Sequence, residues 1–352
     1  MLLRRIPRRD LAATHAGDFP GFLQSAHRRE FQNLSANNAL ARLWAKDASL
    51  WPAEQYQTES LKSNLRWLDL SEQLGPLLAR VAARALKIEP AGFEDVVFVT
   101  MGDSNLAAES ILRLPAAKLG TRIFLLDYID PDSVRAFDEM LHLDRTLFVF
   151  ANKSGKHLET HSLLLYFLER LRVLGIHHPA RHFVTLTEEN SYLGELAGEY
   201  NFLDNFLDPP GVHGRYSSLI HFNFFLAALC RSAPGDLLAR TQSMRDACGP
   251  SAPGEANPAL SLGAFLAAEI EGLDRLVFFS TDSLKPVARR IGYLVGASTG
   301  KKRRGIVPIF GRSSYRLEML QLGCFVAILK MAGKKTATTS CPKPMCRWSP
   351  SN

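Results

Sequence analysis

The sequence is poor in cysteine and has no long apolar run. Its five cysteines among 352 residues are odd in number and scattered, so a disulfide framework is not expected. The one close pair, Cys341 and Cys346, has neither a second pair nor a nearby histidine that would complete a zinc site. The stretch from Phe222 to Leu229 is far shorter than the roughly 20 residues that span a bilayer. We therefore expect a cytoplasmic chain with reduced thiols, no metal and no membrane partner.

Aromatic residues are absent from the two basic clusters of the chain. The net charge of +7 suits anionic partners, which include nucleic acid, acidic lipid and phosphorylated metabolites. The clusters, at residues 4–9 and Lys301–Arg304, have no interleaved aromatic side chains that could stack on bases. A solvated surface is the better interpretation, and no nucleic-acid partner is predicted. No apolar segment follows the first cluster, which argues against a secretory signal or an organelle presequence.

The hydrophobic pattern changes near residue 86. Before it, apolar residues at three- and four-residue spacing predict helices. After it, short runs rich in β-branched and aromatic residues alternate with helical segments. These runs are apolar nearly throughout, as is typical of parallel strands covered on both faces, so we predict a doubly wound α/β fold. The predicted strands are Val96–Met101, Ile123–Asp127, Thr146–Ala151 and His182–Thr187.

A second, shorter series of strands follows a proline-rich loop at residues 250–258. The series predicts a second α/β unit that is incomplete, with strands at Leu276–Ser280, Ile306–Phe310 and Cys324–Leu329. The expected organisation is a helical segment at 1–86, a first α/β domain at 87–249, a second at 250–331 and a disordered polar tail at 332–352.

The first junction between a predicted strand and a helix is Met101–Asn105. Gly102 allows a tight turn there, and Ser104 is expected at a helix N-terminus, where free N–H groups and a hydroxyl suit a phosphate oxygen. The alternative is an ordinary serine N-cap.

The second junction concentrates polar groups around Gly155. It ends an apolar strand and opens a helix, which is a natural arrangement for binding an anion, although the spacing is not that of a Walker A motif. A solvated turn is the alternative, but two such loops on neighbouring strands favour phosphate. The residues that we assign to this site are Asn152, Lys153, Ser154, His157 and Thr160.

A third element, Gly211–Ser217, places Arg215 on a glycine-flanked turn before an apolar helix. A guanidinium there could stabilise a developing oxyanion, or it could brace the turn. The pattern alone does not decide between the two.

At these loops the sequence resembles the glucose-6-phosphate isomerase family, and most closely the isomerase half of bacterial transaldolase/glucose-6-phosphate isomerase fusions. The resemblance implies two sugar isomerase (SIS) domains with doubly wound, flavodoxin-like parallel sheets. It also implies glucose 6-phosphate and fructose 6-phosphate as substrates, no metal or organic cofactor, a homodimer, and a place in glycolysis and gluconeogenesis. Further matching segments are Leu43–Trp51, Trp67–Leu70, Asn257–Leu260, Ser298–Lys301 and Gly305–Pro308.

The resemblance also assigns roles to individual residues. Ser104 matches a phosphate contact of the first loop, and Arg215 matches the arginine that steadies the enediolate. Lys153, Ser154 and Thr160 match the second phosphate loop. The family's base is a glutamate that moves a proton between C2 and C1 of the open-chain sugar, and this sequence has Ala297 there. Losing a general base typically costs roughly 10²–10⁴-fold in rate, so a weak or inactive isomerase is predicted, with Glu159 as a guessed substitute.

Other positions depart from the family pattern as well. Asp103 replaces a glycine, Asn152 replaces a serine, and Lys156 and His157 replace two threonines. Two further hypotheses stay open. Beside the isomerase, the chain could be a non-catalytic SIS module that binds a sugar phosphate and regulates another process, or a decaying or truncated gene product whose polar tail comes from a shifted reading frame.

Overall fold

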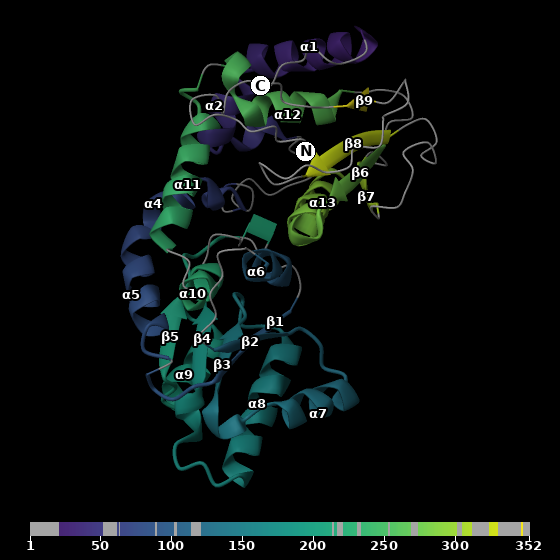
Figure 1. Ribbon diagram of the computed structural model, residues 1–352. Helices are drawn as coiled ribbons and strands as arrows, with labels where there is room; N and C mark the ends of the chain where they lie inside the picture. The colour runs from purple at the N-terminus through teal and green to yellow at the C-terminus, as the bar shows by residue number, and fades with distance from the viewer. Residues whose placement is uncertain are drawn as a thin grey trace. The chain divides into compact units, whose positions relative to one another are not determined.

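The computed structural model describes residues 21–51, 62, 64–88, 90–101, 104–113, 121–212, 215–216, 221–230, 234–252, 254–268, 274–300, 305–311, 324–329 and 346–347 (Figure 1). The chain divides into two compact units, Ser63–Ala239 and the combination of Met1–Lys62 with Arg240–Asn352. The predicted boundaries at residues 86, 249 and 331 stay predictions. The predicted tail lies outside the described residues, apart from 346–347.

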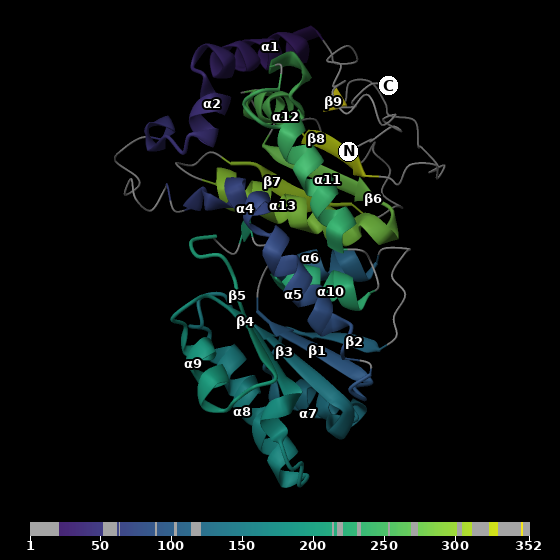
Figure 2. The ribbon, with the colours of Figure 1, turned by 90° about the vertical axis from the view of Figure 1, so that its left-hand side faces the viewer.

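The unit Ser63–Ala239 is built on a five-stranded parallel sheet with the order β2-β1-β3-β4-β5 (Figure 2). Each predicted strand of this region is present to within one or two residues. The predicted doubly wound α/β fold is therefore confirmed. The strands are β1 (Asp95–Thr100), β2 (Arg122–Leu126), β3 (Thr146–Ala151), β4 (Phe183–Thr187) and β5 (Asp204–Leu207).

Helices cover both faces of this sheet because both faces are apolar. Side chains alternate along a strand, so in β1 Val96 and Phe98 enter one core while Val97 and Val99 enter the other. The first core includes α5 (Gly75–Ala85), α6 (Ser104–Leu112) and α10 (His221–Leu229); the second includes α7 (Pro131–Met140), α8 (Leu158–Val173) and α9 (Tyr192–Glu199). Shorter helical turns are Arg66–Asp69, α4 (Leu70–Gln73), Leu143–Arg145 and Pro179–His182.

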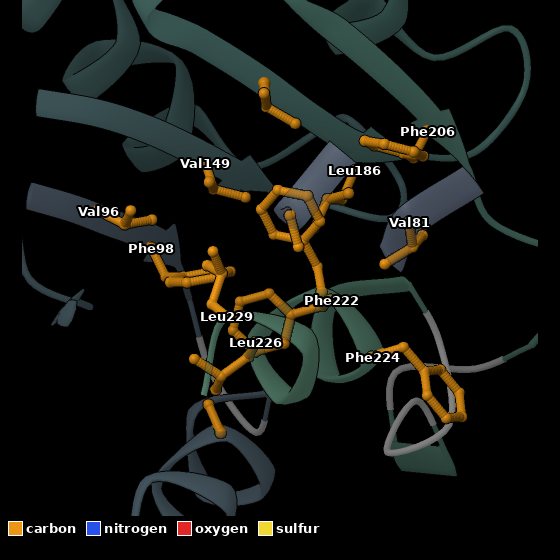
Figure 3. Packing of buried hydrophobic residues seen from close by; sticks show 14 of the residues in the cluster. Val81, Val96, Phe98, Val149, Leu186, Phe206, Phe222, Phe224, Leu226 and Leu229 are labelled. Atoms are coloured by element: carbon orange, nitrogen blue, oxygen red, sulfur yellow. The ribbon is translucent and has the colours of Figure 1, made fainter. Parts of the chain in front are cut away.

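Aromatic side chains dominate both cores. In the first core, Phe222 of α10 meets Phe98 edge to face, with ring centroids 5.1 Å apart (Figure 3). In the second, Phe148 of β3 stacks on Phe167 of α8 at 4.3 Å. Such rings bury large apolar areas, and pairs of this geometry add roughly 0.5–1.5 kcal/mol beyond burial. The packed strands and helices therefore hold the ends of the loops at the sheet edge in fixed positions.

The second unit contains a smaller parallel sheet with the order β7-β6-β8-β9. All three strands predicted for this region are present. Helix α1 packs against α12, where the His27 Nε2 atom lies 3.2 Å from the Ser261 carbonyl oxygen. The strands are β6 (Arg275–Ser280), β7 (Val307–Phe310), β8 (Cys324–Leu329) and β9 (Cys346–Arg347). The helices of this part are α1 (Gly21–Ala36), α2 (Ala39–Trp44), α11 (Pro234–Ala247, which contains the division between the units), α12 (Pro258–Ala267) and α13 (Lys285–Thr299), with single turns at Ala48–Leu50, Gly254–Ala256 and Asp282–Leu284.

Of the helices in the described part of the chain, none is both long enough and apolar enough to cross a bilayer.

Candidate functional site

The strand order creates a topological switch point between β1 and β3. After β1 the chain crosses to β2 on one side, and it then returns to place β3 on the other side of β1. The last residues of these strands, Thr100 and Ala151, are register partners. The loops that follow them therefore start from neighbouring positions at the carboxyl edge of the sheet. In open α/β sheets, ligands bind outside the strands at this place.

The first of these loops contributes a polar residue that the sequence did not single out. Gly102 and Asp103 lie outside the described residues, and Ser104 is the first residue of α6. Asn105 is buried, and its Nδ2 atom donates to the Thr100 carbonyl at 3.3 Å. Its Oδ1 atom has no hydrogen-bond partner among the described residues. No sequence pattern marked Asn105, because its importance comes from its place at the switch point.

The second loop is shaped by Asn152 and Gly155. Asn152 is only 3% exposed, and its Oδ1 atom accepts a hydrogen bond of 3.1 Å from the Gly155 N–H. Gly155 has a φ of +63°, which favours glycine, and a Cβ there would lie 2.8 Å from Ser191 Cβ. The sharp turn and the close approach to the next loop both require this glycine.

The loop after β4 holds the second loop in place. The buried Thr187 hydroxyl donates to the Asn152 carbonyl at 2.8 Å and shares a hydrogen bond of 2.7 Å with the Ser191 hydroxyl. Ser191 in turn caps helix α9 by accepting from the Gly194 N–H at 3.1 Å. The backbone of the second loop is therefore anchored on its side facing β4.

Lys153 does not extend into solvent from this loop. Its side chain is 14% exposed, and its Nζ atom lies 2.8 Å from Glu188 Oε1 and 3.2 Å from the Pro209 carbonyl oxygen. The ammonium that the sequence assigned to substrate binding is thus paired with a carboxylate of the protein.

Three buried polar groups near the start of α8 have no hydrogen-bond partner among the described residues: the Asn152 Nδ2 amide, the Thr160 hydroxyl and the His161 Nε2 atom. Buried polar atoms in proteins are nearly always hydrogen-bonded, so exceptions such as these indicate a ligand or water. His157 occupies the N-cap position, and within the described chain its side chain makes no capping bond. The first N–H groups of α8 and the helix dipole favour an anion at this end. Ser154 and His157 are exposed beside it.

His161, one turn into α8, is a second histidine of this region. Burial lowers its pKa from the ordinary value of 6.5, and the charge of His157 lowers it further, while a hydrogen bond to the Gly155 backbone acts in the opposite direction. Its ring meets Tyr192 edge to face at 4.9 Å. The geometry therefore favours a neutral imidazole, which no sequence pattern indicated.

Arg215 lies on a short helical turn that aromatic stacking supports. Arg215 and Tyr216 are the described residues of this turn and are both half-buried, and the Tyr216 ring stacks on Trp67 at 4.8 Å with 15° between the planes. Arg66 Nη1 donates to the Pro210 carbonyl at 3.4 Å. The segment around Trp67 that matched the family pattern therefore packs against the turn that carries Arg215.

Ala297 belongs to the other unit, where it lies in the last turn of α13. The neighbouring hydroxyl of Thr299 donates to the Val295 carbonyl at 2.8 Å and accepts from the Ile306 N–H at 2.9 Å. These bonds connect the C-terminal end of α13 to the residue that precedes β7. A methyl group at position 297 offers no atom that could accept a proton. Glu159, the guessed substitute, is exposed in the first turn of α8.

The described residues contain no group of three or more histidine, cysteine, aspartate or glutamate side chains that could hold a metal ion.

The parallel sheet and its switch-point loops define a doubly wound α/β protein with polar loops at the carboxyl edge of the sheet. No protein-family model matches the chain. The glucose-6-phosphate isomerase of Acaryochloris marina (strain MBIC 11017) is 27% identical over 278 residues, which cover 77% of this chain and 51% of that protein. The chain thus spans about half the length of the curated relatives it matches. The predicted resemblance to glucose-6-phosphate isomerases is confirmed; the particular likeness to the fusion proteins stays a prediction.

Solved structures share the fold. A hypothetical protein from Thermus thermophilus superposes with a TM-score of 0.72 at 23% identity, covering 87% of this chain and 73% of that chain. A glucose-6-phosphate isomerase from Chlamydia trachomatis gives a TM-score of 0.58 at 19% identity, covering 81% of this chain and 57% of that chain. At these identities the likeness concerns the fold alone.

Proposed function

We propose that this chain binds sugar phosphates and is a glucose-6-phosphate isomerase-like protein whose turnover is weak or absent. The observation that carries the proposal is the pair of buried, unsatisfied groups, Asn152 Nδ2 and the Thr160 hydroxyl, at the N-terminal end of α8 and at the switch point of the sheet. Neutral donors at a helix N-terminus are suited to phosphate, because they add hydrogen bonds to a favourable dipole.

In the proposed site, the phosphate contacts the two loops and the reacting carbons face Arg215, which stabilises the enediolate. A proton then has to move between C2 and C1, for which a positioned carboxylate is needed. Ala297 cannot supply it. The loop residues proposed to bind substrate are Gly102, Ser104, Asn152, Ser154, His157 and Thr160. We further propose cytoplasmic action as a homodimer, in glycolysis and gluconeogenesis, without a metal or an organic cofactor.

Thermal unfolding with a panel of ligands tests binding apart from turnover. The panel contains glucose 6-phosphate, fructose 6-phosphate, mannose 6-phosphate, free glucose and inorganic phosphate. A ligand at 100 times its dissociation constant adds about 2.7 kcal/mol to the free energy of unfolding. We expect the hexose phosphates to raise the melting temperature, and the variant Asn152→Ala to lose the effect. If no hexose phosphate at millimolar concentration shifts the parent chain, the proposal is wrong.

A coupled isomerase assay tests the role of Ala297. We expect Ala297→Glu to raise turnover by roughly 10²-fold or more over the parent, because a general base contributes about this much. The control is Ala297→Gln, because glutamine has nearly the same shape as glutamate but cannot accept the proton. If the parent and both variants bind hexose phosphate but none of them turns it over, the missing carboxylate is not the cause of the low turnover.

That last outcome would support a second candidate, a non-catalytic sugar-phosphate-binding SIS module with a regulatory role. The observation that favours it is the alanine at the base position in a chain that keeps the polar loops at its switch point.

A further inference from the structure

Lys153 connects three consecutive loops at the carboxyl edge of the sheet. It follows β3, while its ion-pair partner Glu188 follows β4 and its second acceptor, the Pro209 carbonyl, follows β5. The strands pair in the order β3-β4-β5, so these loops are neighbours in space. One ammonium group thus spans the loops that follow three adjacent strands.

Backbone hydrogen bonds extend the connection beyond the ends of the strands. The Glu188 N–H donates to the Lys153 carbonyl at 3.0 Å, and the Asp208 N–H donates to the Thr187 carbonyl at 2.7 Å. The segment that begins at Pro209 leads, six residues later, to Arg215. The contacts of Lys153 therefore join the proposed phosphate loop to the chain segment that carries the proposed oxyanion stabiliser.

We propose that Lys153 and Glu188 form a latch that positions these loops, and that Lys153 acts through the latch and not as a direct phosphate ligand. The inference deepens the proposed function and rests on it. The two side chains are 14% and 29% exposed, so their charges are partly withdrawn from water and interact more strongly than a surface pair. The carboxylate 2.8 Å from the ammonium cancels most of its attraction for a second anion.

The latch and the direct contact predict opposite effects of Glu188→Gln. If Lys153 holds the phosphate directly, removing the adjacent carboxylate frees its charge and tightens hexose phosphate binding. If the pair is a latch, the same change loosens the two loops and weakens binding. For a latch we expect Glu188→Gln to weaken hexose phosphate binding by roughly three- to tenfold, because charge-assisted hydrogen bonds between partly exposed groups contribute about this much.

The experiment measures hexose phosphate affinity by calorimetry for the parent chain, Glu188→Gln, Lys153→Met and the double variant. We expect both single variants to bind more weakly, and the double variant to bind no more weakly than Lys153→Met, since each change breaks the same interaction. The matched control is Glu189→Gln, which removes one negative charge from the exposed neighbouring residue and is expected to leave affinity within about twofold. Glutamine is close to isosteric with glutamate, so Glu188→Gln still tests the latch if Lys153→Met folds poorly.

Hydrogen exchange gives a readout that needs no ligand. In the latch variants the amides of Glu188 and Asp208 should exchange faster than in the parent, while those of the central strand β3 stay unchanged. Tighter binding by Glu188→Gln would overturn the latch, as would unchanged exchange at both amides. If the parent binds no hexose phosphate, the proposed function fails, whereas the exchange data still decide whether the latch exists.

Discussion

Replacing Gly155 by alanine tests the geometry of the second loop most directly. The residue has a φ of +63°, and an L-residue pays about 1–2 kcal/mol in this left-handed region. The added methyl group would also lie 2.8 Å from Ser191 Cβ and 3.2 Å from the Tyr192 backbone nitrogen. Neither neighbour is the end of a flexible side chain, so the backbone has to shift, at a further cost of about 1–3 kcal/mol. We expect Gly155→Ala to lower the free energy of unfolding of this unit by about 2–5 kcal/mol.

Gly175→Ala is the matched control for this prediction. Gly155 precedes helix α8 and Gly175 follows it. Gly175 also has a positive φ, of +76°, but no described atom lies within 4 Å of a Cβ placed there. It therefore carries the backbone penalty without the steric one, and we expect a loss of only about 1–2 kcal/mol. The difference in the free energy of unfolding between the two variants therefore measures the steric contact between residue 155 and the loop after β4.

Urea unfolding followed through the slow amide hydrogens of β3, such as that of Val149, reports the stability of this unit. We also expect Gly155→Ala to weaken hexose phosphate binding, because the loop that carries Asn152 has to move, whereas Gly175→Ala should not. If the two variants lose equal stability, then Gly155 and Ser191 do not approach each other as closely as the structure shows, and the reasoning is refuted.

Three further changes probe other parts of the chain. Phe167→Ala should cost about 3–5 kcal/mol because the ring is fully buried against Phe148, while Leu165→Ala on the exposed face of the same helix should cost under about 1 kcal/mol in a urea titration. Gly263→Ala, at an exposed position inside α12 with open space around its Cβ, should raise stability by about 0.5–1 kcal/mol, and a lower melting temperature would contradict this. Because burial lowers the pKa of His161, this residue binds more protons in the unfolded chain than in the folded chain below pH 6.5, so its contribution to stability should be level above that pH and fall beneath it. His161→Asn should flatten that slope.

Much of the fold followed from local patterns in the chain. Runs that are apolar at every position, such as Val96–Val99, have to be covered on both faces, and parallel strands with helical crossovers provide that cover. The strand ends were also visible, because polar residues and glycines such as Gly155 interrupt the apolar runs. The alanine at position 297 needed no structure, since its lack of a proton acceptor is a property of the residue itself.

Pairings between distant residues could not be predicted in this way. Sequence patterns put Lys153 on an anion-binding loop, but its partner Glu188 lies 35 positions further along the chain and meets it only because β3 and β4 pair in one register. Asn105 was overlooked for the same reason, since only the strand order brings its loop beside that of Asn152.

The sequence by itself thus determined the class of fold, the ends of the strands that it predicted and the lack of a carboxylate at position 297, because periodicity, turn chemistry and side-chain identity act over a few neighbouring residues. Only the tertiary structure decided which loops share the switch point and which charges cancel. Those outcomes depend on strand order and register, which arise from contacts between segments far apart in the chain.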